Sequence, residues 1–96
     1  MDDPIDILTM HTMLHESVVL DRRNLFDFLV QSGANLNLRD QNGYTPLLKA
    51  ASIGSLEYTK ALIEAGVCAN QIDPHGNTPL DKATLYGHIE VIRYLQ

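Results

Sequence analysis

The chain has 96 residues and a net charge of −5, and 45% of its residues are apolar and 20% charged. This composition predicts one small globular domain, because it is too apolar for a disordered chain and no apolar run approaches the ~18 residues of a membrane span. The seven Lys and Arg residues are scattered, so no clustered basic surface exists and we expect no nucleic-acid partner.

Two further features indicate where the protein works. The N-terminal residues MDDPIDI are acidic, whereas signal and transit peptides carry basic residues. Cys68 is the single cysteine, which excludes an internal disulfide and fits a reducing compartment. We therefore expect an intracellular protein, cytoplasmic or nuclear, that does not act at a membrane.

The sequence repeats itself at an offset of 33 residues. At this offset GYTPLLKA, which begins at Gly43, aligns with GNTPLDKA, which begins at Gly76. The same shift in the other direction aligns the first third of the chain with the second. This offset divides a single domain into four parts: a tail at residues 1–6, a first repeat at 7–39, a second at 40–72 and a truncated third at 73–96.

The first repeat departs from the pattern of the other two. Met10 stands where they have the turn glycine, Met13 where they have proline, and Asp21 where they have the glycine between helices. A terminal repeat has no neighbour on its outer side, so its turn need not match a preceding one. We expect this repeat to act as an atypical cap.

The second repeat contains the clearest local signals. Gly43 follows an asparagine and permits a tight turn, since glycine adopts a positive φ without steric strain. Thr45 and Pro46 predict the N-cap and first position of a helix that ends at Gly54. A second amphipathic helix follows and ends before Gly66. Neither helix is long enough to be stable alone, so we expect the repeats to stack.

This pattern resembles the ankyrin repeat, which has a period of 33 residues and a turn followed by T-P-L-H-x-A and two antiparallel helices. The resemblance is carried by DQNGYTPLLKAASIGSLEYTKALIEAG and DPHGNTPLDKATLYGHIEVIRYLQ, and more loosely by TMLHESVV and FDFLVQSGANLN. It implies an all-α solenoid of three stacked helix-turn-helix units with short β-hairpin-like turns. It also implies a non-catalytic module that binds other proteins.

The resemblance further implies a concave binding surface for a partner protein or an extended peptide. In this family the surface consists of the turn tips and the exposed side of the first helix of each repeat. The corresponding residues of this chain are His11, Val19, Leu20, Gln41, Asn42, Tyr44, Ser52, Ile53, His75, Asn77, Leu85 and Tyr86. The alternative is that these side chains pack against adjacent helices or contact flanking repeats.

The third repeat stops inside its second helix. Val91, Ile92 and Leu95 are predicted to form a stacking face that a following repeat would cover. Two hypotheses account for this face: the chain is a segment of a longer ankyrin array with a structural or assembly role, or the face is covered by a partner or, through self-association, by a second copy of the chain. An exposed apolar helix end predicts self-association in either case.

Catalytic and metal sites are not predicted. His15-Glu16 lacks the second histidine of the metalloprotease pattern, and no set of three or four ligands follows from the sequence. Cys68 has no basic neighbour in the sequence that would activate it. His15 instead matches the family's T-P-L-H histidine, which the resemblance implies hydrogen-bonds to a neighbouring turn. We expect no enzyme activity and no cofactor.

One modification remains a hypothesis. Asn37 and Asn70 each follow a leucine by eight residues, which resembles the site that an asparaginyl hydroxylase modifies on some ankyrin proteins. The acidic residue that usually precedes this site is missing, because Asn35 and Cys68 stand there.

Overall fold

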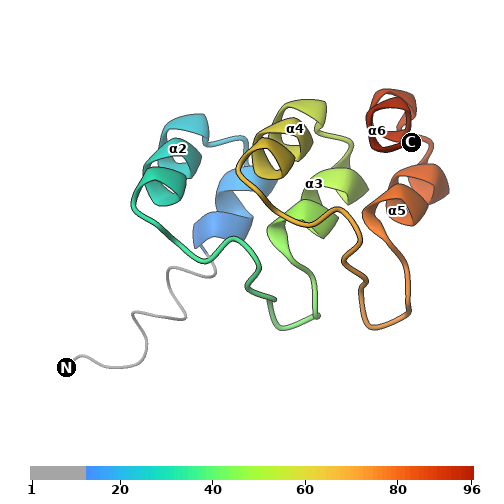
Figure 1. Cartoon of the computed structure of the whole chain (residues 1–96), viewed down its shortest axis with the longest axis horizontal. Coiled ribbons are helices and arrows are strands. Elements are labelled where there is room, and N and C mark those ends of the chain that lie inside the picture. Colours follow the sequence, from blue (N-terminus) through green and yellow to red (C-terminus); the bar gives the residue numbers. More distant parts are fainter. Residues whose placement is uncertain (1–12) are drawn as a thin grey trace.

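The computed structural model describes residues 13–96. Residues 13–19 are helical, and the following helices are α2 (Arg23–Gln31), α3 (Pro46–Ile53), α4 (Leu56–Glu64), α5 (Pro79–Tyr86) and α6 (Ile89–Leu95). No strand occurs within the described range. Figure 1 shows two layers, with α2, α4 and α6 in one and segment 13–19, α3 and α5 in the other. The predicted all-α stack of helix pairs is confirmed.

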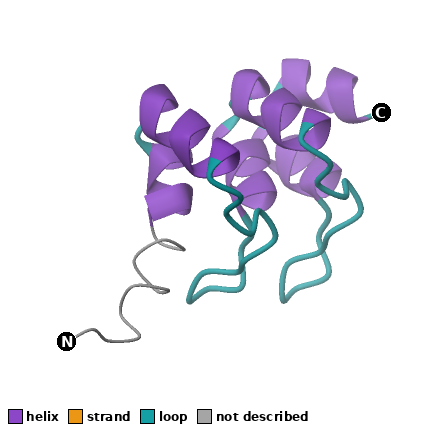
Figure 2. Ribbon diagram, turned by 60° about the vertical axis from the view of Figure 1, so that its left-hand side comes forward, coloured by secondary structure: helices purple, strands orange, loops and turns teal. Residues whose placement is uncertain are grey.

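The two loops that join successive pairs extend from the same edge of the stack (Figure 2). The helices that follow them begin at the predicted threonine-proline pairs. The hydroxyl oxygen of Thr45 accepts a hydrogen bond from the backbone N–H of Leu48 (3.2 Å). Thr78 caps α5 in the same way, and Asp81 completes a capping box by accepting from the Thr78 N–H (3.1 Å). Each cap satisfies donors that a helix start otherwise leaves unpaired.

In each pair, the first helix is followed by a residue with a left-handed backbone conformation. Gly54 has a φ of 81° and Gly87 a φ of 73°, and each ends the first helix of its repeat. Asp21 takes the same position in the first repeat with a φ of 58°. Aspartate is one of the few residues other than glycine that visits this region readily, so the missing glycine does not prevent the turn.

Asp21 is also a link between the first two repeats. Its carboxylate accepts a hydrogen bond from the hydroxyl of Tyr58 on α4 (2.9 Å). The ring of Tyr58 is buried and meets Phe26 of α2 edge to face, with centroids 4.8 Å apart. Burial and the bond to Asp21 raise the pKa of Tyr58 to about 12.

Small residues allow α3 and α5 to pack closely. Ala51 and Ala83 are both fully buried and belong to one apolar cluster. Side-chain size sets the distance at which helices pack, so alanines at this contact permit a close approach. The larger cluster lies between the first two repeats and consists of Leu14, Val18, Phe26, Leu29, Leu47, Ala50, Tyr58, Leu62 and Val67.

The predicted stacking face of the third repeat needs one correction. Val91 is fully buried and packs against Ala51 and Ala83, so it faces inward and not toward an open end. Ile92 and Leu95 are half-buried against the same cluster. Periodicity alone places Val91 on the apolar face of α6 but does not indicate which neighbour covers it.

Candidate functional site

The site is built on two equivalent turns, one before α3 and one before α5. In the first, a carboxylate oxygen of Asp40 accepts hydrogen bonds from the backbone N–H groups of Asn42 (2.8 Å) and Tyr44 (2.9 Å). The N–H of Asp40 donates to the carbonyl of Tyr44 (2.8 Å), and Gly43 adopts a φ of 82°. This aspartate turn fixes the backbone that carries the predicted contact residues.

The second turn repeats this geometry with a buried carboxylate. Asp73 accepts from the backbone N–H groups of His75 and Asn77, both at 2.9 Å. Its other oxygen lies 3.1 Å from the ammonium of Lys82. Burial alone would raise the pKa of Asp73, but the Asn77 N–H, the Lys82 ammonium and the His75 N–H together lower it to about 2. Asp73 is therefore charged at neutral pH.

Tyr44 connects all three repeats. Its carbonyl accepts a hydrogen bond from Nε2 of His15 in the first repeat (2.7 Å). Its ring lies 4.8 Å from the ammonium of Lys82 in the third repeat and 5.3 Å from that of Lys49 in its own. Ammonium groups at this distance are attracted by an aromatic ring. The bond from His15 agrees with the role that the family resemblance implies for this histidine.

The two turns are held against each other. A Cβ placed on Gly43 would lie 2.4 Å from Cγ of Pro74 in the next turn, so only glycine fits there. The guanidinium of Arg39 donates to the carbonyls of Gly43 (2.8 Å) and Ile72 (2.7 Å), one on each loop. The relative position of the turns is thus set by direct contacts.

The second and third repeats are joined near the far ends of α3 and α5. Nε2 of His88 donates to the carbonyl of Ser52 near the C-terminus of α3 (2.8 Å). The imidazole also fills the space next to Gly54, where an added Cβ would lie 2.4 Å from Nδ1 of His88. Carbonyls in the last turn of a helix lack a partner within the helix, and His88 satisfies one of them.

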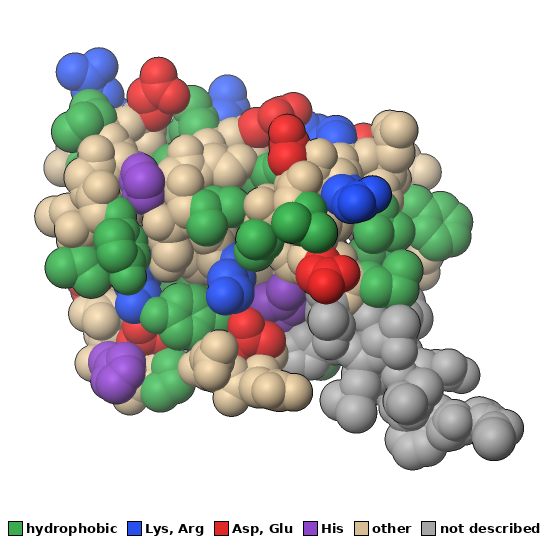
Figure 3. All heavy atoms as spheres, turned by 180° about the vertical axis from the view of Figure 1, so that it is seen from behind, with side chains coloured by type: hydrophobic (Ala, Val, Ile, Leu, Met, Phe, Trp, Pro, Cys, Tyr) green, Lys and Arg blue, Asp and Glu red, His purple; other side chains and the backbone are tan. Residues whose placement is uncertain are grey.

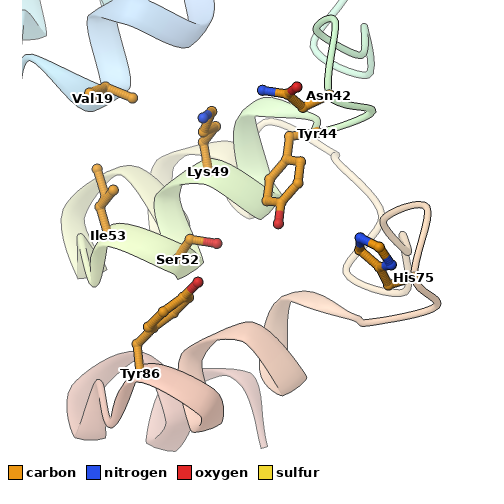
Figure 4. A pocket seen from close by; sticks show the side chains of 8 residues that line it. All are labelled: Val19, Asn42, Tyr44, Lys49, Ser52, Ile53, His75 and Tyr86. Atoms are coloured by element: carbon orange, nitrogen blue, oxygen red, sulfur yellow. The ribbon is translucent and has the colours of Figure 1, made fainter.

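An open groove of about 630 Å³ lies between the contacts that join the two turns and the His88–Ser52 hydrogen bond. It crosses all three repeats, and Figure 4 shows α3 at its centre with α5 on one side and segment 13–19 on the other. The residues that line this groove are Val19, Asn42, Tyr44, Lys49, Ser52, Ile53, His75 and Tyr86. Three of them are large apolar side chains with substantial exposure: Val19 (45%), Ile53 (43%) and Tyr86 (56%).

The face seen in Figure 3 combines apolar and charged chemistry. Hydrophobic side chains form separate patches across this face, with basic, acidic and histidine side chains between them. None of the eight residues that line the groove is acidic. The groove therefore differs from the chain as a whole, whose net charge is −5.

Five of the twelve predicted contact residues do not line the groove. Gln41 and Asn77 lie on the turns beside it, and Leu85 is exposed on α5. Leu20 lines a different hollow, together with Arg22 and Asn24 among other residues. His11 lies outside the described residues. The other seven predicted residues are brought together.

Lys49 lines the groove but was not predicted. A signal for it exists in the sequence, because the 33-residue offset aligns Asp40 and Lys49 with Asp73 and Lys82. The ammonium of Lys49 lies 3.9 Å from the carboxylate of Asp40, a looser contact than the 3.1 Å between Lys82 and Asp73. The aligned lysines therefore have different environments: Lys82 is buried, and Lys49 reaches the groove.

A family model for ankyrin repeats, described as three copies, matches residues 11–96. The chain belongs to the ankyrin repeat family. Among curated proteins, none matches this chain. Ankyrin repeats generally mediate protein–protein interactions, and the family is generally non-catalytic.

Two features of the ankyrin stack bear on other functions. Within residues 13–96, no three His, Cys, Asp or Glu side chains come together in an arrangement that could hold a metal ion. In the same range, none of the helices has the length and apolar character required to cross a bilayer. Asn37 and Asn70 are both exposed, and the Asn37 side chain accepts a hydrogen bond from Gln71 (2.6 Å). Hydroxylation of either asparagine stays a prediction.

Proposed function

We propose that this ankyrin repeat chain is a non-catalytic module that binds a partner protein or peptide in the groove beside α3. The observation that carries the proposal is the convergence of side chains from three repeats on one groove, including the exposed Val19, Ile53 and Tyr86. Exposed apolar side chains gathered beside polar ones are typical of protein-interaction sites. Tyrosine is also enriched among the residues that dominate binding energy.

The rigidity of the surrounding turns supports the same proposal. The carboxylates of Asp40 and Asp73 organise the turns, and Arg39 bridges them. A surface that is already ordered loses less conformational entropy when it binds. The groove is thus suited to recognition by preformed contacts.

Affinity capture from cell extract with a double variant, Ile53→Glu and Tyr86→Glu, tests the proposal. Both side chains are exposed, so we expect the variant to keep its helical circular dichroism and to lose its captured partners. Tyr44 stays unchanged because its ring lies against Lys82. The matched control is Phe28→Glu, which charges a more exposed apolar residue on α2, outside the groove. Capture that survives the double variant, or is lost equally with the control, would contradict the proposal.

Self-association through α6 is the second candidate function. It is favoured by the exposure of Ile89 (58%) and Tyr94 (36%) on that helix. Light scattering at increasing protein concentration tests it. A dimer that Ile89→Glu dissociates would support this candidate, and a monomer at all concentrations would exclude it.

We also propose that the partner is met inside the cell and is not a nucleic acid. The thiol of Cys68 is free and exposed, as expected for a protein of a reducing compartment. The net charge of −5 disfavours a polyanionic partner. Fractionation of cells and a filter-binding assay with duplex DNA test these two points.

A further inference from the structure

We propose that residues 2–7 of the chain, DDPIDI, pack on the outer face of the first repeat. This outer face consists of Leu20, Leu25 and Phe28, with Arg22 beside them. It lies at the end of the stack opposite α6 (Figure 1), and none of these residues lines the groove. The proposal therefore concerns a second surface, independent of the proposed function.

The 33-residue repeat shows what covers such a face elsewhere in the stack. Leu25 and Phe28 of α2 align with Tyr58 and Ala61 of α4. Tyr58 is 1% exposed, and its ring meets Phe26 of the preceding repeat. Ala61 packs against the same apolar cluster. In the second repeat, this face is thus covered by the layer that comes before it.

In the first repeat, the same face is open within residues 13–96. Leu20 is 55% exposed, Phe28 is 64% exposed and Leu25 is half-buried. Leu25 and Phe28 are three residues apart on α2 and so share one side of the helix. Leu20 and Leu25 line one open hollow of about 600 Å³. Figure 3 shows hydrophobic side chains at the end of the stack that the first repeat forms. The three residues therefore form one apolar face.

Residues 2–7 are joined to the chain close enough to reach this face. Met13 lies about 10 Å from Leu20 along the first helix, and a packed helix such as α2 lies about 8–10 Å to the side. The chain from Ile7 to Met13 can span up to about 20 Å. A tethered segment also has a higher effective concentration at the face than a separate molecule. This segment is therefore a better occupant than a second copy.

The sequence of the segment suits an apolar face. Ile5 and Ile7 are two residues apart, so both point to the same side of an extended chain while Asp6 points to the other. Pro4 favours the extended conformation, because it has a fixed φ and disfavours helical geometry at Asp3. The two isoleucines can thus cover the outer face while the intervening carboxylate stays in water.

The charges of the two surfaces are complementary. Arg22 is exposed and has no acidic partner in the described part of the chain. Its neighbours in the hollow are already engaged within the stack, Arg23 by carboxylates and Asp21 by a tyrosine hydroxyl. The first turn of α2 also lacks an acidic residue, although negative charge is favoured there. Asp2 and Asp3 supply that charge.

A tryptophan at position 7 reports the packing directly, because the chain has no other tryptophan. We expect Ile7→Trp to emit at a shorter wavelength in the folded protein than in urea. Adding Phe28→Glu should shift the emission toward that of a water-exposed indole. Leu85→Glu is the matched control, since Leu85 is 66% exposed but lies on α5. Water-exposed emission from Ile7→Trp alone, or emission that Phe28→Glu leaves unchanged, would overturn the inference.

A double-mutant cycle tests the same contact without a tryptophan. The double variant Ile5→Ser, Ile7→Ser should lower the midpoint of thermal unfolding by about 4 °C or more. The decrease should be much smaller when Phe28→Ser is already present, because residues in contact are not additive. It should remain complete in a chain that carries Leu85→Ser. No decrease, or the same decrease with Phe28→Ser, would show that the segment does not pack on Phe28.

Light scattering beside the fluorescence measurement distinguishes the segment from a second copy. We expect the emission of Ile7→Trp to be independent of protein concentration and already shifted in the monomer. A shift that appears only at concentrations where a dimer forms would mean that a second copy covers the outer face, and it would overturn the inference.

Discussion

Lys82 and Asp73 form a buried ion pair that joins a helix to the turn before it. The ammonium lies 3.1 Å from the carboxylate, and the two side chains are 6% and 0% exposed. The ring of Tyr44, from the preceding repeat, lies 4.8 Å from the same ammonium. Lys82 thus holds together the turn that carries His75 and the turn that carries Tyr44, and both residues line the groove.

Removal of the Lys82 charge should destabilise the protein more than removal of the Lys49 charge. Lys82→Met replaces the lysine with an unbranched, uncharged side chain. It leaves the Asp73 carboxylate buried without its cation. We expect the midpoint of thermal unfolding, followed by circular dichroism, to fall by roughly 5 °C or more. Lys49→Met is the control, because its pair is longer and partly exposed. Equal decreases for the two variants would show that the buried pair has no special role.

Asp73 should also make stability depend on pH in the acid range. Its pKa is about 2 in the folded protein against an ordinary value of 3.8, so the unfolded state takes up the proton first as the pH falls. The stability that Asp73 contributes is complete above pH 3.8 and is lost as the pH falls toward 2. Urea unfolding at several pH values should show a shallower decline for Asp73→Asn than for the unchanged protein. Parallel declines would contradict the lowered pKa.

Tyr58→Phe should weaken the link between the first two repeats. The change removes the hydroxyl that donates to Asp21 at 2.9 Å but keeps the ring against Phe26. We expect the free energy of unfolding in urea to fall by about 1 kcal/mol, the usual contribution of one hydrogen bond. Tyr94→Phe, on the exposed side of α6, serves as the control and should leave stability unchanged. A Tyr58→Phe variant as stable as this control would show that the bond contributes nothing.

Alanine at Gly54 should be more harmful than alanine at Gly87. Both glycines have a positive φ, which costs a non-glycine residue about 1–2 kcal/mol. Only at Gly54 would the new methyl group also lie 2.4 Å from the imidazole of His88, since no atom lies within 4 Å at Gly87. In urea unfolding, the free energy of unfolding of Gly54→Ala should be clearly lower than that of Gly87→Ala. The reverse ranking would mean that the His88 contact is easily displaced.

The repeat itself explains why most of the fold was predictable. Thr45-Pro46 and Thr78-Pro79 begin helices in the structure because capping and the fixed φ of proline are local effects. The glycines that end α3 and α5 follow from the same local rules. Seven of the predicted contact residues line the groove. Among them, Asn42 and His75, like Ile53 and Tyr86, occupy equivalent positions of adjacent repeats, which stacking brings side by side.

The errors and omissions concern contacts between repeats. Val91 was predicted on an open face but packs on Ala51, a residue forty positions earlier. Lys49 and Lys82 are equivalent in the sequence, yet one lines the groove and the other is buried beside Tyr44 of the preceding repeat. Periodicity identifies an apolar or repeated position, but the neighbouring repeat decides whether that position is covered.

The central claim is that partners bind in the groove beside α3. Chemical-shift mapping tests this claim most directly. The ¹⁵N-labelled chain is titrated with the partner recovered by affinity capture, and the backbone amide signals are followed. We predict that the largest shifts occur at Asn42, Ser52, Ile53, His75 and Tyr86. Shifts confined to Ile89 and Tyr94 of α6, or to Phe28 of α2, with the groove signals unchanged, would contradict the claim.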